Sequence, residues 1–173
     1  MGGKDVAERE KKLLKAQPEK NLDVMDAESA DNLLRPLENY IGVFLPESLR
    51  KIKIVSYPAS LLVLTDEHWI SFYLSDKNME IMDSMGYLAK DDIDEDLEAF
   101  VTAHATAKEI STTPRIQQPD SNLCSLYAIG FLYYRSFECG TLCDFCENFR
   151  PDLSLNSKII KNFFSTILEI NNS

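Results

Sequence analysis

The chain has little of what marks membrane, secreted or nucleic-acid-binding proteins. Its 173 residues contain no apolar run near the ~20 residues of a membrane-spanning helix, and no charged-then-apolar signal peptide opens it. Its 18 basic residues are outnumbered by 28 acidic ones, and the net charge of -10 argues against a sequence-independent grip on nucleic-acid phosphates. We therefore expect one domain, inside a cell, that acts on neither membranes nor nucleic acid.

Cysteine and histidine are scarce as well. Four cysteines do not make a disulfide scaffold in a chain of this length. Cys139, Cys143 and Cys146 form a C-x3-C-x2-C cluster, but a structural zinc site takes four ligands, and His68 and His104 both lie far upstream. We therefore expect no metal site and interpret the three cysteines as ordinary thiols.

The most informative stretch is the loop before Cys124 together with the apolar run after it. Pro119, Asp120, Ser121 and Asn122 favour turns, so a loop must precede a helix that begins near Cys124. At a helix N-terminus, unpaired backbone N–H groups and the positive end of the dipole favour an anion, which lowers the pKa of a thiol. Cys124 is therefore a candidate nucleophile, and an inert core cysteine is the alternative.

Hydrophobic periodicity predicts an α+β fold with a mainly antiparallel sheet between helices. Residues 1–30 are charged and poor in large apolar side chains, which predicts a mobile arm ahead of one domain over residues 31–173. The expected elements are a helix over 29–41, strands over 52–57, 61–64, 68–74 and 79–82, a helix over 91–104, a strand over 108–112, and helices from 124 and over 157–170.

Three further side chains can serve a thiol nucleophile, which needs a base. The hairpin formed by 68–74 and 79–82 should carry His68 and Asp83 to the same edge of the sheet, where the carboxylate would orient the imidazole. Gln118 lies six residues before Cys124 and is an uncharged donor suited to a developing oxyanion. A lone histidine of this kind is otherwise a surface or satisfied core residue.

Four short blocks, in this order, resemble those of the adenain and ubiquitin-like-protein protease superfamily of cysteine peptidases: His68-Trp69, Asp83-Ser84-Met85-Gly86, Gln117-Gln118-Pro119 and Cys124. The resemblance extends over roughly residues 33–170 and implies a papain-like fold with the catalytic cysteine at a helix N-terminus.

Roles for single residues follow from the same resemblance. It implies Cys124 as nucleophile, His68 as general base and acid, Asp83 as the orienting acid and Gln118 as oxyanion donor. Trp69 would form a wall of a narrow cleft that admits Gly-Gly or Gly-X-Gly before the scissile bond. A protein substrate is implied, and no metal or other cofactor.

Two branches of the superfamily remain open. The segment 40–49 and the compact size resemble viral, virophage and transposon maturation proteases, which predicts an endopeptidase that processes capsid or other virion precursors, in the host cytoplasm or nucleus or in the virion. The alternative is a deconjugating or processing protease for a ubiquitin-like modifier of the SUMO type, which the block from Asp83 to Gly86 favours. Leu123 and Ser125 stand where such deconjugases have Asp and Gly.

Three other expectations complete the sequence-based picture. Because no cysteine lies between Asp83 and Cys124, a disulfide-linked activating peptide of the adenoviral type is not expected. Acyl transfer to a protein, as in effector acetyltransferases with similar catalytic geometry, is opposed by the Gln-Gln-Pro block. A non-catalytic binding module is opposed by the presence of all four catalytic residue types.

Overall fold

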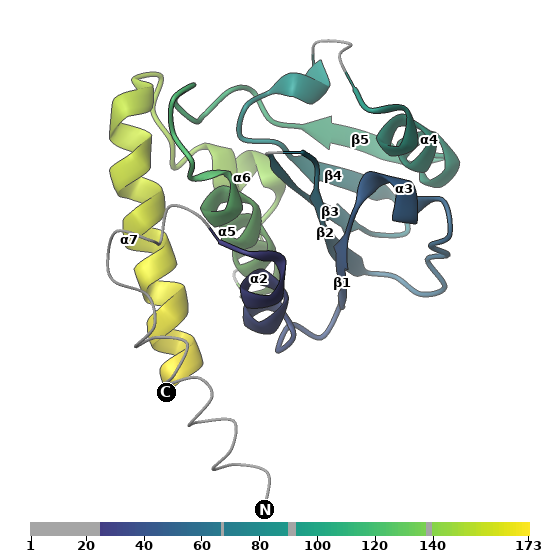
Figure 1. Ribbon diagram of the computed structural model, residues 1–173, viewed down its shortest axis with the longest axis horizontal. Helices are drawn as coiled ribbons and strands as arrows, with labels where there is room; N and C mark the ends of the chain where they lie inside the picture. The colour runs from purple at the N-terminus through teal and green to yellow at the C-terminus, as the bar shows by residue number, and fades with distance from the viewer. Residues whose placement is uncertain (1–24, 67, 90–92, 138–139) are drawn as a thin grey trace, which may run out of the picture.

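The computed structural model describes residues 25–66, 68–89, 93–137 and 140–173. They form an α+β domain in which a five-stranded sheet lies between two groups of helices (Figure 1). The elements are α2 (Ala27–Leu34), β1 (Tyr40–Phe44), α3 (Pro46–Leu49), β2 (Ala59–Leu64), β3 (Trp69–Leu74), β4 (Asn78–Met82), the 3-10 helix η2 (Tyr87–Ala89), α4 (Glu95–His104), β5 (Glu109–Thr112), α5 (Cys124–Phe137), α6 (Leu142–Cys146) and α7 (Leu153–Asn172). None of the described helices is both long and apolar enough to cross a membrane.

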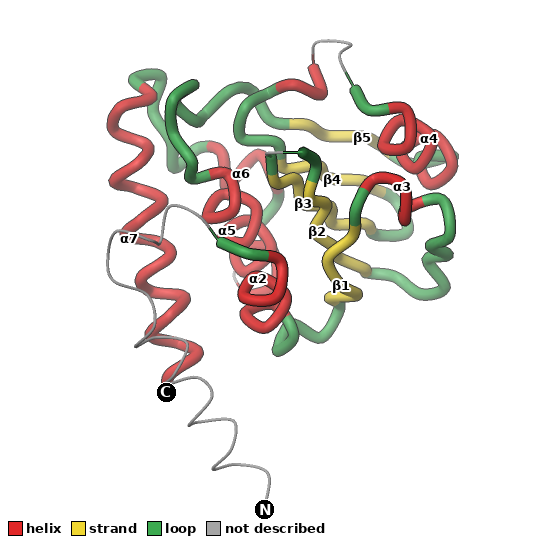
Figure 2. The backbone as a smooth tube through the Cα atoms, in the orientation of Figure 1, coloured by secondary structure: helices red, strands yellow, loops and turns green. Residues whose placement is uncertain are grey.

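The sheet is mixed, whereas the sequence predicted a mainly antiparallel one. Its strands follow chain order, β1-β2-β3-β4-β5, and the two central ladders, β2 with β3 and β3 with β4, are antiparallel. The outer ladders, β1 with β2 and β4 with β5, are parallel. A parallel pair needs a crossover that returns the chain to the starting end, and α3 and α4 lie in those two connections (Figure 2).

The central strand β3 is buried on both faces, and this fixes where α5 packs. Trp69 and Tyr73 face a cluster with α2, α5 and α7, whereas Phe72 faces a second cluster with α3 and α4. Ser71 Oγ donates a hydrogen bond of 2.9 Å to the carbonyl oxygen of Ala128 within α5. The N-terminal half of α5 is thereby held against β3.

Two expected elements are wrong. The first helix ends at Leu34, and Tyr40–Phe44 is strand β1, because Pro36 ends the helix early. Residues 52–57 alternate in hydrophobicity but form no strand: Ile52 and Ile54 pack against the cluster that contains α3 and α4, while Val55 is 91% exposed and the segment joins none of the described strands. The short helices α3 and α6 were not expected, since four or five residues give too little periodicity to detect.

The expected arm, residues 1–30, lies mostly outside the described residues. Its last part is ordered: Asp26 caps α2 by accepting the Ser29 N–H at 2.7 Å, and Met25 and Ala30 are buried in the core. Met25 thereby reaches the surface around Cys124.

Candidate active site

The β3–β4 hairpin brings a histidine and an aspartate together. Its register pairs Ser71 with Met82, so His68, just before β3, and Asp83, just after β4, lie at the same edge of the sheet. His68 Nε2 lies 2.6 Å from Asp83 Oδ1, and both side chains are buried. With Nε2 bonded to the carboxylate, the other ring nitrogen, Nδ1, is left for a second partner.

Asp83 is held as a charged group although it is fully buried. Its Oδ2 accepts the Leu88 N–H at 2.9 Å, and its Oδ1 also accepts the Met85 N–H at 3.2 Å. Burial by itself raises the pKa of this carboxyl, but the bond to His68 and these two N–H groups outweigh it and lower the pKa. The Asp83 N–H donates to Thr113 Oγ1 at 3.0 Å, which ties the residue to the chain beyond β5.

Gly86 closes the turn that presents Asp83. Its N–H donates to the Asp83 carbonyl oxygen at 2.9 Å, and its φ of +67° is a conformation that other residues rarely adopt. A Cβ there would lie 2.9 Å from the backbone nitrogen of Arg115. The turn can therefore approach the loop before Cys124 only because this residue has no side chain.

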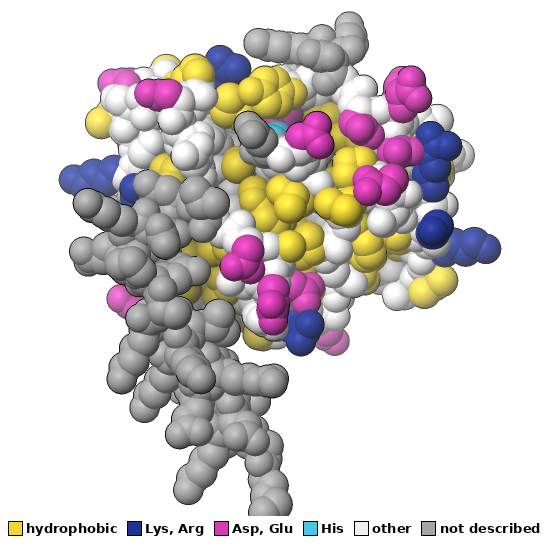
Figure 3. All heavy atoms as spheres, viewed as in Figure 1, with side chains coloured by type: hydrophobic (Ala, Val, Ile, Leu, Met, Phe, Trp, Pro, Cys, Tyr) yellow, Lys and Arg dark blue, Asp and Glu magenta, His cyan; other side chains and the backbone are white. Residues whose placement is uncertain are grey.

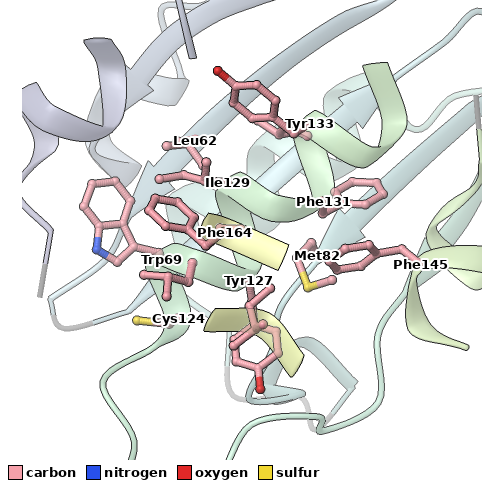
Figure 4. Packing of buried hydrophobic residues seen from close by; sticks show 14 of the residues in the cluster. Leu62, Trp69, Met82, Cys124, Tyr127, Ile129, Phe131, Tyr133, Phe145 and Phe164 are labelled. Atoms are coloured by element: carbon pink, nitrogen blue, oxygen red, sulfur yellow. The ribbon is translucent and has the colours of Figure 1, made fainter. Parts of the chain in front are cut away.

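Cys124 begins α5, and its thiol lines the same cleft as His68 and Trp69. Burial by itself raises the pKa of the Cys124 thiol, but hydrogen bonding from the His68 ring and from the N–H groups of Trp69 and Ser125 outweighs burial and lowers the pKa. Figure 4 places the sulfur beside Trp69 at one end of the buried cluster.

The surroundings of the His68 ring favour its protonated form. Burial by itself lowers its pKa, but the hydrogen bonds and charges of Asp83 and Cys124 outweigh burial and raise the pKa to about 9. The Tyr87 ring meets the imidazole edge-on, with centroids 5.4 Å apart, and limits its rotation. At neutral pH these shifts favour an imidazolium beside a thiolate.

A cleft of about 590 Å³ opens over this group. His68, Trp69 and Cys124 line it, so Trp69 stands where the sequence placed a wall. Met25 and Tyr87 also line it, and sequence reasoning did not identify either. Met25 had been assigned to the arm, and Tyr87 had no signal beyond its place after the block that contains Asp83.

The two glutamines of the loop differ in position. Gln118, the expected oxyanion donor, accepts a hydrogen bond from Ser157 Oγ of α7 at 3.3 Å and is not among the cleft-lining residues. Gln117 lines the cleft and is buried: its Oε1 accepts from Ser84 Oγ at 2.6 Å, and its Nε2 donates to the Ser121 carbonyl oxygen at 2.6 Å. Among the described residues, no acceptor binds the second N–H of that amide.

Two other cysteines, Cys143 and Cys146, lie on α6, and neither lines the cleft. Cys143 is exposed and Cys146 is partly buried, while Cys139 falls outside the described residues. Within the described ranges, no three His, Cys, Asp or Glu side chains are placed to hold a metal ion together.

Comparison with known proteins gives similarities of architecture alone. No protein-family model matches the chain, and no curated protein matches it in sequence. The central domain of Lpg1148, an uncharacterised protein from Legionella pneumophila, is 14% identical, with a TM-score of 0.47 over 84% of this chain and 98% of that one. The SUMO protease Ulp1, with its catalytic cysteine oxidised to a sulfinic acid, is 13% identical, with a TM-score of 0.47 over 89% of this chain and 83% of that one.

Proposed function

We propose that this protein is a cysteine peptidase that cleaves protein substrates. The observation that carries the proposal is the buried hydrogen bond between Asp83 and the His68 ring, which lines the same cleft as the Cys124 thiol at the start of α5. A thiol at a helix N-terminus, an imidazole in contact with it and a carboxylate that orients the imidazole are the groups that nucleophilic acyl transfer requires. A merely structural cysteine needs none of them.

The reaction follows from these contacts. The Cys124 thiolate attacks the carbonyl carbon of the scissile amide, and the C=O electron pair moves to the oxygen. The His68 imidazolium donates its proton to the leaving nitrogen as the C–N bond breaks, which leaves an acyl thioester and a neutral ring. His68 then takes a proton from water as the water attacks the thioester, and the acid product and the thiolate are released.

The oxyanion needs donors on the cleft side of Cys124. The backbone N–H of Cys124 is one, and a glutamine amide from the preceding loop is the other. Sequence favoured Gln118 for this role. The position of Gln117 in the cleft wall, with an uncommitted N–H and an orientation set by Ser84, supports Gln117 instead.

Trp69 supports a preference for small residues before the scissile bond. Its indole is 5% exposed and lines the cleft directly beside the sulfur, so a bulky side chain on the acyl side would meet the ring. Substrates ending in Gly-Gly or Gly-X-Gly on that side fit best. This agrees with processing of virion precursors, our primary assignment, and with release of a ubiquitin-like modifier as the alternative.

One experiment tests the chemistry and separates the two substrates. The full chain is offered a capsid-type peptide containing Gly-X-Gly and a fusion of a SUMO-type modifier ending in Gly-Gly. Cys124→Ala serves as the blank and Cys146→Ala as the matched control, which should retain full activity. Cleavage of the peptide favours the maturation protease, and cleavage of the modifier fusion alone rejects it. Equal turnover by Cys124→Ala would remove the nucleophile assignment.

A further inference from the structure

A second pocket adjoins the cleft at His68. Its volume is about 550 Å³, and it shares Leu64, His68 and Tyr87 with the cleft above Cys124. The two hollows are therefore continuous around the imidazole. Nothing in the proposed chemistry uses this second pocket, which we name the acidic pocket after the residues described below.

The acidic pocket has an apolar wall and a charged rim. Ile70 of β3, Leu97 of α4 and the half-exposed Leu45 contribute to the wall. The rim carries the exposed carboxylates of Glu47, Asp66 and Asp94, and no lysine or arginine is among the described residues that line it. The pocket thus combines apolar surface with uncompensated negative charge.

The rim carboxylates are available to a ligand. Among the described residues, none of the three forms an ion pair, whereas the neighbouring Asp96 is paired with Arg50. Asp94 is partly committed, because its Oδ1 accepts the N–H groups of Asp96 and Leu97 as the cap of α4. Glu47 and Asp66 have no such bond, so they carry most of the available charge.

Figure 3 shows this arrangement on the surface. A histidine lies at the bottom of a hollow, acidic side chains gather beside it, and basic side chains lie farther out toward the edge of the molecule. Apolar side chains cover the surface between these groups. A basic group that enters the hollow would therefore meet acids first.

The position relative to His68 identifies the part of the substrate that would enter. A general acid must come within hydrogen-bond reach of the nitrogen that it protonates, so the leaving segment passes directly beside the His68 ring. With Trp69 and Cys124 in the cleft wall, the acyl segment would lie over these two residues. The segment that departs would then pass His68 into the acidic pocket, which shares this residue with the cleft.

We propose that the acidic pocket binds the side chain of a lysine or arginine on the leaving-group side of the scissile bond. Such side chains are amphipathic: the aliphatic stem packs on apolar surface while the charged head stays in water, which matches an apolar wall with an exposed acidic rim. This inference rests on the proposed peptidase function, and it adds a specificity site that the catalytic group does not define.

The test compares substrates that differ after the scissile bond alone. Peptides with one acyl segment carry lysine, norleucine or glutamate at the first two leaving-group positions, and an aminocoumarin amide of the same acyl segment has no leaving-group residue. For the unmodified protein, we expect kcat/KM for the lysine peptide to exceed that for norleucine by about fivefold to tenfold, as two or three exposed charge pairs would give. High salt should reduce this ratio.

Variants assign the effect to the pocket. In the Glu47→Gln, Asp66→Asn double variant, the lysine preference should fall to about twofold or less, because only the partly committed Asp94 remains. Glu47→Lys with Asp66→Lys should prefer the glutamate peptide. The matched control is Asp96→Asn, which removes a paired carboxylate outside the pocket and should leave the preference intact. Turnover of the aminocoumarin amide should be the same in all of these proteins.

The outcomes separate this inference from the function on which it rests. Turnover of the aminocoumarin amide with equal rates for lysine and norleucine, or a lysine preference that survives in the double variant, overturns the acidic pocket alone. Absence of any turnover overturns the peptidase proposal. In that case, the fluorescence anisotropy of labelled peptides bound to Cys124→Ala still decides the pocket: tighter binding of lysine than norleucine supports it, and equal binding rejects it.

Discussion

Cys124 and Cys146 both hold thiols largely out of water, yet their pKa values move in opposite directions. Burial, and then the neighbouring Cys143, raise the pKa of Cys146 to about 12. Burial acts on Cys124 in the same sense, but His68 and two backbone N–H groups reverse it. Cys124 begins α5, whereas Cys146 ends α6, so the helix dipoles add to the contrast. Burial alone raises the pKa of a thiol and keeps it protonated. The hydrogen-bond donors around Cys124 lower its pKa and favour the thiolate.

Replacing His68 tests this contrast most severely. His68→Ala should reduce peptide cleavage by about a thousandfold, since it removes the general acid and base together. It should also make Cys124 resemble Cys146, because burial would then act with less opposition. Alkylation of Cys124 by iodoacetamide at neutral pH, followed by mass spectrometry, should slow sharply, while alkylation of the exposed Cys143 serves as internal reference.

The matched control for that prediction is the second histidine. His104 bonds through Nδ1 to the Phe100 carbonyl oxygen at 2.9 Å within α4. His104→Ala should leave both cleavage and Cys124 alkylation near their original values. Fast alkylation of Cys124 in His68→Ala would mean that the helix terminus, not the ring, activates the thiol.

Loss of the oxyanion donor should give the next largest fall in activity. If Gln117 supplies the amide, Gln117→Ala should lower kcat by about a hundredfold with little change in KM, because the bond forms only in the transition state. Gln118→Ala is the paired variant and should lower kcat only a few-fold. Steady-state kinetics on the aminocoumarin amide measures both, and the reverse ranking would restore Gln118 as the donor.

Asp83 should matter less than His68, because it acts through the ring. Asp83→Asn keeps the size of the side chain but removes the charge that raises the pKa of His68. The imidazolium is then less stable and the ring loses the charged acceptor that orients it, so kcat/KM should fall by about tenfold or more. Asp66→Asn, tested on the aminocoumarin amide, is the control and should have no effect.

The pH dependence of cleavage should show the smallest effect, but it reports most directly on the pKa values of Cys124 and His68. The thiolate exists above the lowered pKa of Cys124, and the imidazolium exists below the raised pKa of His68, about 9. Cleavage should therefore hold a plateau through neutral pH and decline as pH rises through about 9. A histidine with an ordinary pKa of about 6.5 would end the plateau near that value instead. Measuring kcat/KM across the neutral and alkaline range distinguishes the two, and the two limbs belong to the coupled pair.

Local signals allowed the centre of the fold to be predicted from sequence. The hairpin that carries His68 and Asp83 has a short polar turn and apolar strands, and the turn formers before Cys124 predict where α5 begins. The strand over 108–112 was predicted and is β5, but the parallel pairing of the two outer strands was not, since β1 and β5 pair with their neighbours only after a crossover. The four or five residues of each strand carry no sequence signal that indicates its pairing partner.

In the candidate site, too, some features could be predicted from the sequence and others could not. The convergence of His68, Asp83 and the Cys124 thiol follows from strand register and helix start, which periodicity can give. The choice between Gln117 and Gln118 depends on the side chains of Ser84 and Ser157, which lie in distant parts of the chain. Adjacent identical residues cannot be separated until the fold supplies those partners.

The order of the candidate active-site residues along the chain has a consequence for biosynthesis. His68 and Asp83 are 15 residues apart in one hairpin, while α5 is fixed to β3 through residues 57 apart, Ser71 and Ala128. As the ribosome makes the chain in order, the hairpin emerges before the sulfur does. The imidazole and carboxylate therefore have no thiol beside them until α5 has been translated and has folded onto the sheet. If the chain is a peptidase, as we propose, an incomplete nascent chain would be unable to cut itself or its neighbours.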